Sequence, residues 1–148
     1  MAKKRIGILT GGGDVPGLNG VIKGVTYRAE ELGFEVLGIR RGWEGLTHLK
    51  PGSTEDEKYL VPLTLDNTRT IDRTGGTWLH SSRTNPRKMK QAALPPTLDA
   101  KKAESMKVGE DRYDITSLVM DNVETLGLDY LIPIGGDDTL SYSRSLHD

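Results

Sequence analysis

Residues 6–19 read IGILTGGGDVPGLN, and this stretch decides the fold. The apolar run 6–9 is short and rich in β-branched residues, which predicts a buried strand. A glycine turn follows, and from Asn19 apolar residues recur at helical spacing until Gly33 ends the helix. The run 34–39 predicts a second strand. A strand, a glycine turn, a helix and a strand in this order form the βαβ unit of a parallel sheet.

The rest of the chain continues the alternation of strands and helices. The predicted elements are a helical turn at 43–46, an edge strand at 59–65, a short helix at 66–73, loop and solvated helix at 87–111, a helix at 113–126, a strand at 130–134 and a helix from 137 to 146. We therefore expect an α/β fold, a three-layer αβα arrangement with a Rossmann-like, mostly parallel sheet. Ligands should bind at the carboxyl ends of its strands.

Composition removes several classes of function. The chain has 148 residues, which suits one domain, and a formal net charge of -1, which argues against a nucleic-acid partner. It has no cysteine, so disulfides and zinc–thiolate sites are excluded, and its three histidines lie far apart in the sequence. No apolar run approaches the roughly 18 residues of a membrane span. We expect a cytoplasmic protein without a membrane partner.

The glycine turn at 10–19 is the first of three candidate ligand-binding segments. Consecutive glycines let the backbone approach an anion closely, and their N–H groups can hold phosphate oxygens at the start of a helix. A tight turn without any ligand explains the same residues. No glycine–lysine–Ser/Thr sequence follows, so an ordinary P-loop NTPase is not expected.

The second segment reads GGTWLHSSRTNP at 75–86. Arg83 follows the glycine turn, and the guanidinium group offers a fork of donors that matches phosphate. Taken alone, the segment is better explained as a surface loop with an exposed arginine. Trp78 and His80 are interpreted as structural residues.

The third segment reads IGGDDT at 134–139. Asp137 and Asp138 are adjacent carboxylates between a strand and a helix, and Mg²⁺ in proteins is commonly held by one or two carboxylates together with substrate phosphates. Helix capping is the alternative, but it requires only one acid.

Taken in this order, the three segments resemble the motifs of the phosphofructokinase family, S/T-GGDxPGxN, GGTxLxSxR and GGDxS/T. The resemblance covers essentially the whole chain. It implies transfer of a phosphoryl group to the 1-hydroxyl of fructose 6-phosphate in glycolysis, with Mg²⁺ as cofactor. The donor-binding residues that it implies are Gly12, Arg83, Thr84, Gly136, Asp137, Asp138 and Thr139. Within this set Asp137 would hold the metal, and Trp43 would occupy the place of an aromatic beside adenine in ATP-using relatives.

Asp138 bears on the choice of donor. ATP-dependent members usually read GGDGS, whereas a second acid is characteristic of pyrophosphate-dependent members. A carboxylate at this position would repel the α-phosphate of a nucleotide and occupy its space, and pyrophosphate avoids both penalties. The resemblance therefore favours pyrophosphate, with ATP as the alternative donor.

The family's catalytic base lies in a TIDND-type motif after the third segment, and no such motif is present here. We expect residues 1–148 to form an incomplete phosphoryl-donor-binding domain, with no catalytic residue in this chain, the sugar-phosphate half absent and the base beyond residue 148. Asp148 has no motif context and is not assigned as a base. The chain alone should be inactive, and the full-length parent should be a dimer or tetramer. A NAD-type kinase and a non-catalytic phosphate- or nucleotide-binding module are the rival interpretations.

Overall fold

The computed structural model describes residues 3–11, 17–53 and 56–147. Its main sheet has the strand order β3-β2-β1-β6, formed by β1 (Arg5–Thr10), β2 (Glu35–Ile39), β3 (Leu60–Leu63) and β6 (Tyr130–Ile134). β1 is parallel to both β2 and β6, whereas β3 is antiparallel to β2. The predicted mostly parallel sheet is confirmed, with the predicted edge strand as its antiparallel member.

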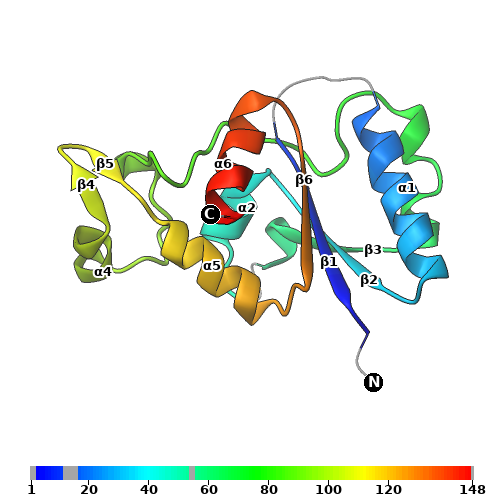
Figure 1. Ribbon diagram of the computed structural model, residues 1–148, viewed down its shortest axis with the longest axis horizontal. Helices are drawn as coiled ribbons and strands as arrows, with labels where there is room; N and C mark the ends of the chain where they lie inside the picture. The colour runs from blue at the N-terminus through cyan, green and yellow to red at the C-terminus, as the bar shows by residue number, and fades with distance from the viewer. Residues whose placement is uncertain (1–2, 12–16, 54–55, 148) are drawn as a thin grey trace.

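Helices cover both faces of this sheet (Figure 1). One face is covered by α1 (Leu18–Glu31). The other carries α2 (Trp43–His48), α5 (Thr116–Thr125) and α6 (Asp137–His147). The strands and helices predicted along the chain thus assemble into the expected three layers.

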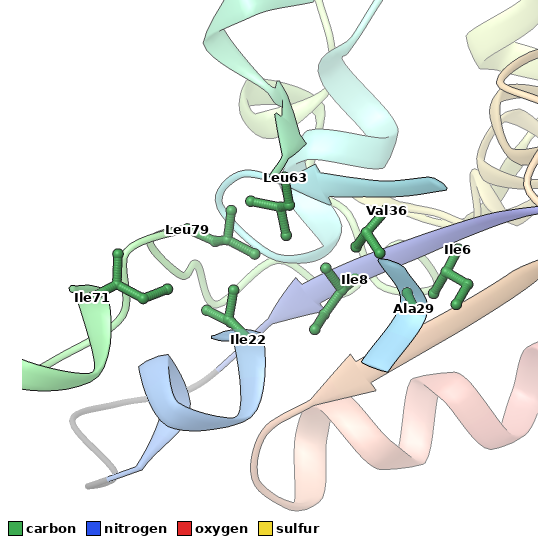
Figure 2. Close-up of a cluster of buried hydrophobic side chains, with 8 residues drawn as sticks. All are labelled: Ile6, Ile8, Ile22, Ala29, Val36, Leu63, Ile71 and Leu79. Carbon is green, nitrogen blue, oxygen red and sulfur yellow. The ribbon is translucent and has the colours of Figure 1, made fainter. Parts of the chain in front are cut away.

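The first core lies between α1 and the sheet. Ile22 and Ala29 of α1 pack against Ile6, Ile8 and Val36 of the strands, as Figure 2 shows. The side chains of β1 alternate between faces, because Ile8 belongs to this core and the next residue, Leu9, to the opposite one. The helical spacing on α1 located the helix correctly, although Val21 and Leu32 of the predicted apolar set are exposed.

The second core lies under α2, α5 and α6. Trp43 packs edge-to-face on Tyr142, with ring centroids 4.7 Å apart, and the Tyr142 hydroxyl donates to Thr116 Oγ1 at 3.1 Å. Thr116 Oγ1 in turn donates to Asp114 at 2.6 Å. Burial raises the pKa of Tyr142 to about 12, because the phenolate would lose its solvent there.

The buried phenol predicts a loss of stability at alkaline pH. Below about pH 10 the phenol is neutral in both the folded and the unfolded chain, and above it the unfolded chain ionises first. The free energy of unfolding should therefore fall by up to about 3 kcal/mol between roughly pH 10 and 12. Tyr142→Phe should lose about 1 kcal/mol at pH 9 with the hydrogen bond, but decline less steeply above pH 10. Urea unfolding of both proteins across this pH range tests the role of Tyr142. An equal fall in the free energy of unfolding in the two proteins would contradict that role.

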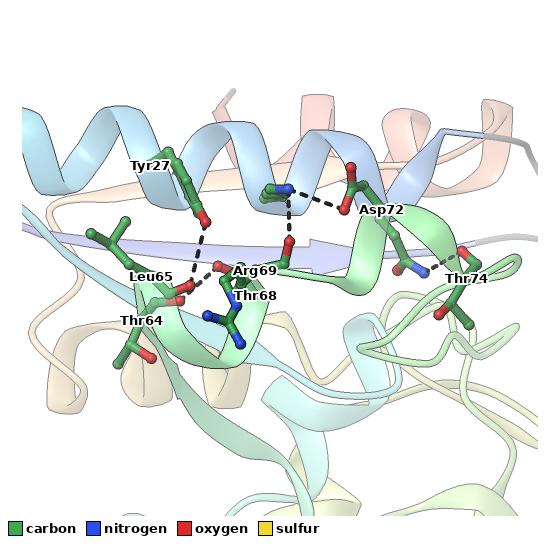
Figure 3. Close-up of polar contacts among 9 residues, drawn as sticks. Tyr27, Thr64, Leu65, Thr68, Arg69, Asp72 and Thr74 are labelled. Atoms are coloured by element: carbon green, nitrogen blue, oxygen red, sulfur yellow. Dashed lines mark hydrogen bonds and ion pairs between the residues drawn. The ribbon is translucent and has the colours of Figure 1, made fainter.

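The segment between β3 and the second glycine turn packs along α1. It contains α3 (Leu65–Thr68) and a 3₁₀ helix, Ile71–Arg73, where one short helix was predicted. Lys23 of α1 donates to the Arg69 carbonyl at 2.7 Å and to Asp72 at 3.1 Å. The bond from the Lys23 ammonium lowers the pKa of Asp72. Figure 3 shows the Arg69 carbonyl and the Asp72 carboxylate facing α1.

Residues 86–115 differ most from the prediction of loop and solvated helix. They contain α4 (Ala100–Ser105) and a hairpin of β4 (Lys107–Gly109) and β5 (Arg112–Tyr113), with a core of their own. Met89, Met106 and Tyr113 are buried in that core. Tyr113 was expected in the following helix, but it pairs with Lys107 in the hairpin, so that helix starts at Thr116.

The longest helix is α1, with 14 residues, and nowhere in the described ranges is a helix long and apolar enough to cross a membrane.

Candidate functional site

The carboxyl ends of three parallel strands meet at one edge of the sheet. β1 pairs Leu9 with Ile39 of β2 and Thr10 with Ile134 of β6. The chain leaves β1 toward α1 on one face, and it leaves β6 toward α6 on the other. Such a reversal is a topological switch point, the place where open α/β sheets bind ligands.

The first and third glycine segments are in direct contact at this edge. The Gly11 N–H donates to the Ile134 carbonyl at 2.8 Å. A Cβ atom at Gly135 would collide with the Gly11 carbonyl oxygen, and one at Gly11 would collide with the Thr139 hydroxyl. Glycine is therefore required at Gly135 by close backbone approach and is favoured at Gly11 by the close packing of the Thr139 side chain.

The second and third segments share a pocket with a volume of about 650 Å³. Six of the seven predicted donor-binding residues line it, namely Arg83, Thr84, Gly136, Asp137, Asp138 and Thr139. Gly12, the seventh, lies outside the described residues. The binding roles of all seven residues stay predictions, but six of the residues surround one pocket.

The charged side chains that line the pocket are exposed and make no ion pairs with other described residues. Asp137 and Asp138 are the exposed first residues of α6, and Arg83 and Lys88 are exposed on the opposite loop. Across the described part of the chain, no hydrogen bond or ion pair engages these four side chains. The positive end of the α6 dipole adds attraction for an anion. Two cations and a helix N-terminus suit phosphate oxygens, while the carboxylates suit a cation that accompanies them.

The alternative of helix capping gains no support, because within the described chain neither Asp137 nor Asp138 is seen to accept a backbone hydrogen bond from α6. The described residues also contain no group of three or more His, Asp or Glu that could hold a metal alone. Two adjacent carboxylates nevertheless fit Mg²⁺, because this ion keeps several waters and takes its other ligands from phosphates.

The surroundings of Thr139 and of Trp43 differ from those that the sequence indicated. Thr139 is only 6% exposed and packs against Gly11 and Gly135, so it holds the two turns together as well as lining the pocket. Trp43 is 3% exposed and does not line this pocket. The structure gives Trp43 a core role in place of the predicted position beside an adenine.

Asn85 and Lys88 line the pocket and were missed. They also border a second hollow of about 620 Å³, which continues from the pocket between the β4–β5 hairpin and α6. No local signal distinguishes Lys88 from the other lysines of the 87–111 stretch. Only the packing of this stretch on its own core directs Lys88 toward the site.

The fold and the pocket together define an α/β protein with a switch-point site suited to an anionic ligand. Residues 5–148 match the family model described as Phosphofructokinase. The chain belongs to the phosphofructokinase family.

Relatives of both donor types match the chain. It is 41% identical to a pyrophosphate–fructose 6-phosphate 1-phosphotransferase of Dictyoglomus thermophilum, over 95% of this chain and 31% of the relative. It is 40% identical to ATP-dependent 6-phosphofructokinase 3 of Streptomyces coelicolor, over 97% of this chain and 33% of the relative. The chain thus spans about a third of the length of the curated relatives that it matches.

Solved structures agree on the fold. Phosphofructokinase from Pichia pastoris in the T-state superposes with a TM-score of 0.70 at 25% identity, over 98% of this chain and 13% of the other. Phosphofructokinase from Saccharomyces cerevisiae gives a TM-score of 0.68 at 24% identity, over 97% of this chain and 15% of the other. The predicted fold class and family are both confirmed.

Proposed function

We propose that residues 1–148 form the phosphoryl-donor-binding part of a 6-phosphofructokinase, and that the donor is pyrophosphate. The observation that carries this proposal is the single pocket in which Asp137 and Asp138 face Arg83 and Lys88. Family membership supports phosphoryl transfer as the reaction class. The residues that bind the acceptor, fructose 6-phosphate, and the general base would lie in the two thirds of the relatives that this chain does not span.

Five residues of the pocket have a proposed task in binding the donor and its metal. Arg83 would hold phosphate oxygens through its fork of donors, and Thr84 and Thr139 would add hydroxyl donors. Gly136 would present its backbone at the N-terminus of α6. Asp137 would hold Mg²⁺, which supplies neutralisation of the phosphate charge when bound.

Asp138 supports pyrophosphate over ATP. Its negatively charged carboxylate is exposed in the pocket and has no hydrogen-bonding or ion-pair partner among the described residues. A nucleotide would bring a further phosphate toward this charge, and like-charge juxtaposition can cost several kcal/mol. ATP remains the alternative donor, because relatives named for each donor match the chain at similar identity.

Calorimetry on the 148-residue chain tests the binding half of the proposal. Pyrophosphate with Mg²⁺ should bind at least about tenfold more tightly than ATP with Mg²⁺, and the affinity should fall when the metal is chelated. Arg83→Met should weaken binding, whereas Arg28→Met, on the exposed face of α1, should not. Tighter binding of ATP would overturn the choice of donor, and no binding of either would count against the site.

A hybrid enzyme tests the catalytic half. In this hybrid, residues 1–148 replace the matching third of the Dictyoglomus thermophilum relative. The hybrid should phosphorylate fructose 6-phosphate in a coupled assay, and the 148-residue chain alone should not. A chain that binds pyrophosphate but gives a folded, inactive hybrid would favour a non-catalytic phosphate-binding module.

A further inference from the structure

Asn19 is a buried polar residue whose side chain both donates and accepts a hydrogen bond. It is the second residue of α1 and is 3% exposed. Its Nδ2 donates to the Thr74 carbonyl at 2.9 Å, and its Oδ1 accepts from the Trp78 N–H at 2.6 Å. Figure 3 labels Thr74, whose carbonyl accepts the first of these two hydrogen bonds. One amide side chain thus binds both ends of the second glycine turn to the start of α1.

A pair of hydroxyl groups fixes the end of the same turn and the residues that follow it. Thr10 is fully buried at the end of β1, and its Oγ1 donates to the His80 carbonyl at 3.0 Å. Since that proton is used, Thr77 Oγ1 must donate to Thr10 Oγ1, at 2.7 Å. His80 has a φ of 59°, which is uncommon for a residue other than glycine and needs support from its surroundings. The turn is therefore held by α1 at Thr74 and Trp78, and β1 holds Thr77 and the following residue His80.

This turn leads directly into the wall of the pocket. Ser82, Arg83 and Thr84 follow it, and all three line the pocket. Beyond the turn, Ser82 Oγ donates to the Arg41 carbonyl at 2.7 Å, but the Arg83 side chain makes no hydrogen bond or ion pair in the described structure. The position of Arg83 thus depends on the backbone that precedes it.

We propose that Asn19 is a positioning residue of the donor pocket, which sets the place of Arg83 and Thr84 through the 74–78 turn. This proposal rests on the proposed function, because it takes the pocket to be the donor site. The amide is the feature that matters, since it combines a donor and an acceptor on one short side chain. Leucine has the same branched arrangement of heavy atoms but offers neither, and would leave the Thr74 carbonyl and the Trp78 N–H unpaired.

The test compares Asn19→Leu with a matched control, Asn122→Leu. Asn122 is also buried, at 5% exposure, and its Nδ2 donates to the Leu46 carbonyl at 2.6 Å between α5 and α2, away from the pocket. Both changes remove a buried amide, but Asn19→Leu should cost more stability, because it leaves two backbone groups unpaired where Asn122→Leu leaves one. In calorimetry well below the melting temperature, Asn19→Leu should bind magnesium pyrophosphate about tenfold more weakly. Asn122→Leu should bind it as the unaltered chain does.

A second readout is independent of the ligand. Hydrogen exchange of the peptide covering residues 77–85 should accelerate in Asn19→Leu and remain unchanged in Asn122→Leu. Should Asn19→Leu fail to fold, Thr77→Val removes the hydroxyl that bonds to Thr10 while keeping its shape, and it carries the same expectations.

The outcomes separate the two proposals. If the unaltered chain binds no magnesium pyrophosphate, the proposed function fails, and exchange at 77–85 alone decides whether Asn19 positions the loop. If that chain binds and Asn19→Leu binds equally well, or if both leucine variants lose affinity to the same extent, Asn19 is an ordinary buried residue and the inference is overturned. Unchanged exchange at 77–85 in Asn19→Leu overturns it in either case.

Discussion

Replacing Asp137 by asparagine is expected to lower the turnover of the hybrid enzyme by roughly a thousandfold, equivalent to about 4 kcal/mol of barrier. Asparagine keeps the size of the side chain but removes the charge that would hold Mg²⁺ beside the phosphates. Asp137 begins α6 and lines the pocket, so nothing else in its surroundings needs to change. Steady-state rates over a range of Mg²⁺ concentrations measure the effect, and the metal concentration required for half-maximal rate should rise.

Asp121→Asn is the control for this change. Asp121 is an exposed aspartate on α5 that lines none of the pocket, and its replacement should leave the rate and the metal dependence unaltered. If Asp137→Asn kept more than about a tenth of the activity with an unchanged metal dependence, the assignment of Asp137 to the metal would be wrong.

Asp138→Gly should shift the donor preference of the hybrid toward ATP by about a hundredfold or more in the ratio of kcat/KM values, since removal of several kcal/mol of repulsion is involved. The change removes both the charge and the volume of the side chain beside the donor phosphates. Glycine in the first turn of α6 costs up to about 1 kcal/mol of helix stability, so rates are compared well below the melting temperature.

Asp138→Asn separates the two causes. It removes the charge but keeps the volume, so recovery of ATP use in this variant would identify repulsion as the dominant penalty. Recovery in glycine alone would identify steric exclusion. An unaltered hybrid that already prefers ATP, or a donor ratio that none of these changes moves, contradicts the proposed role of Asp138.

The sheet and its flanking helices could be predicted because their signals are local. β6 runs from Tyr130 to Ile134, as its apolar run predicts, and α1 ends before Gly33, which adopts the left-handed backbone expected of a helix-terminating glycine. The three glycine segments could be recognised for the same reason, since each follows a strand or a short helix at a visible break in periodicity.

Residues 86–115 could not be predicted because their structure depends on contacts between distant positions. Tyr113 suits either a strand or a helix, and the hairpin with β4 and the bridge to Met89 decide its place. The same packing brings Lys88 to the pocket. Asn19 is a further example, since its role depends on a turn 55 residues away in the chain.

We propose that the segments that follow β1 and β6 and the loop that carries Arg83 bind one phosphate chain together. Titration of the ¹⁵N-labelled chain with magnesium pyrophosphate tests this shared site, with amide chemical shifts as the readout. The amides of Gly12, Thr84 and Gly136 should shift together along one saturation curve, while those of the β4–β5 hairpin tip should shift weakly or not at all. Separate curves for the three segments, or shifts confined to one of them, would contradict a shared site.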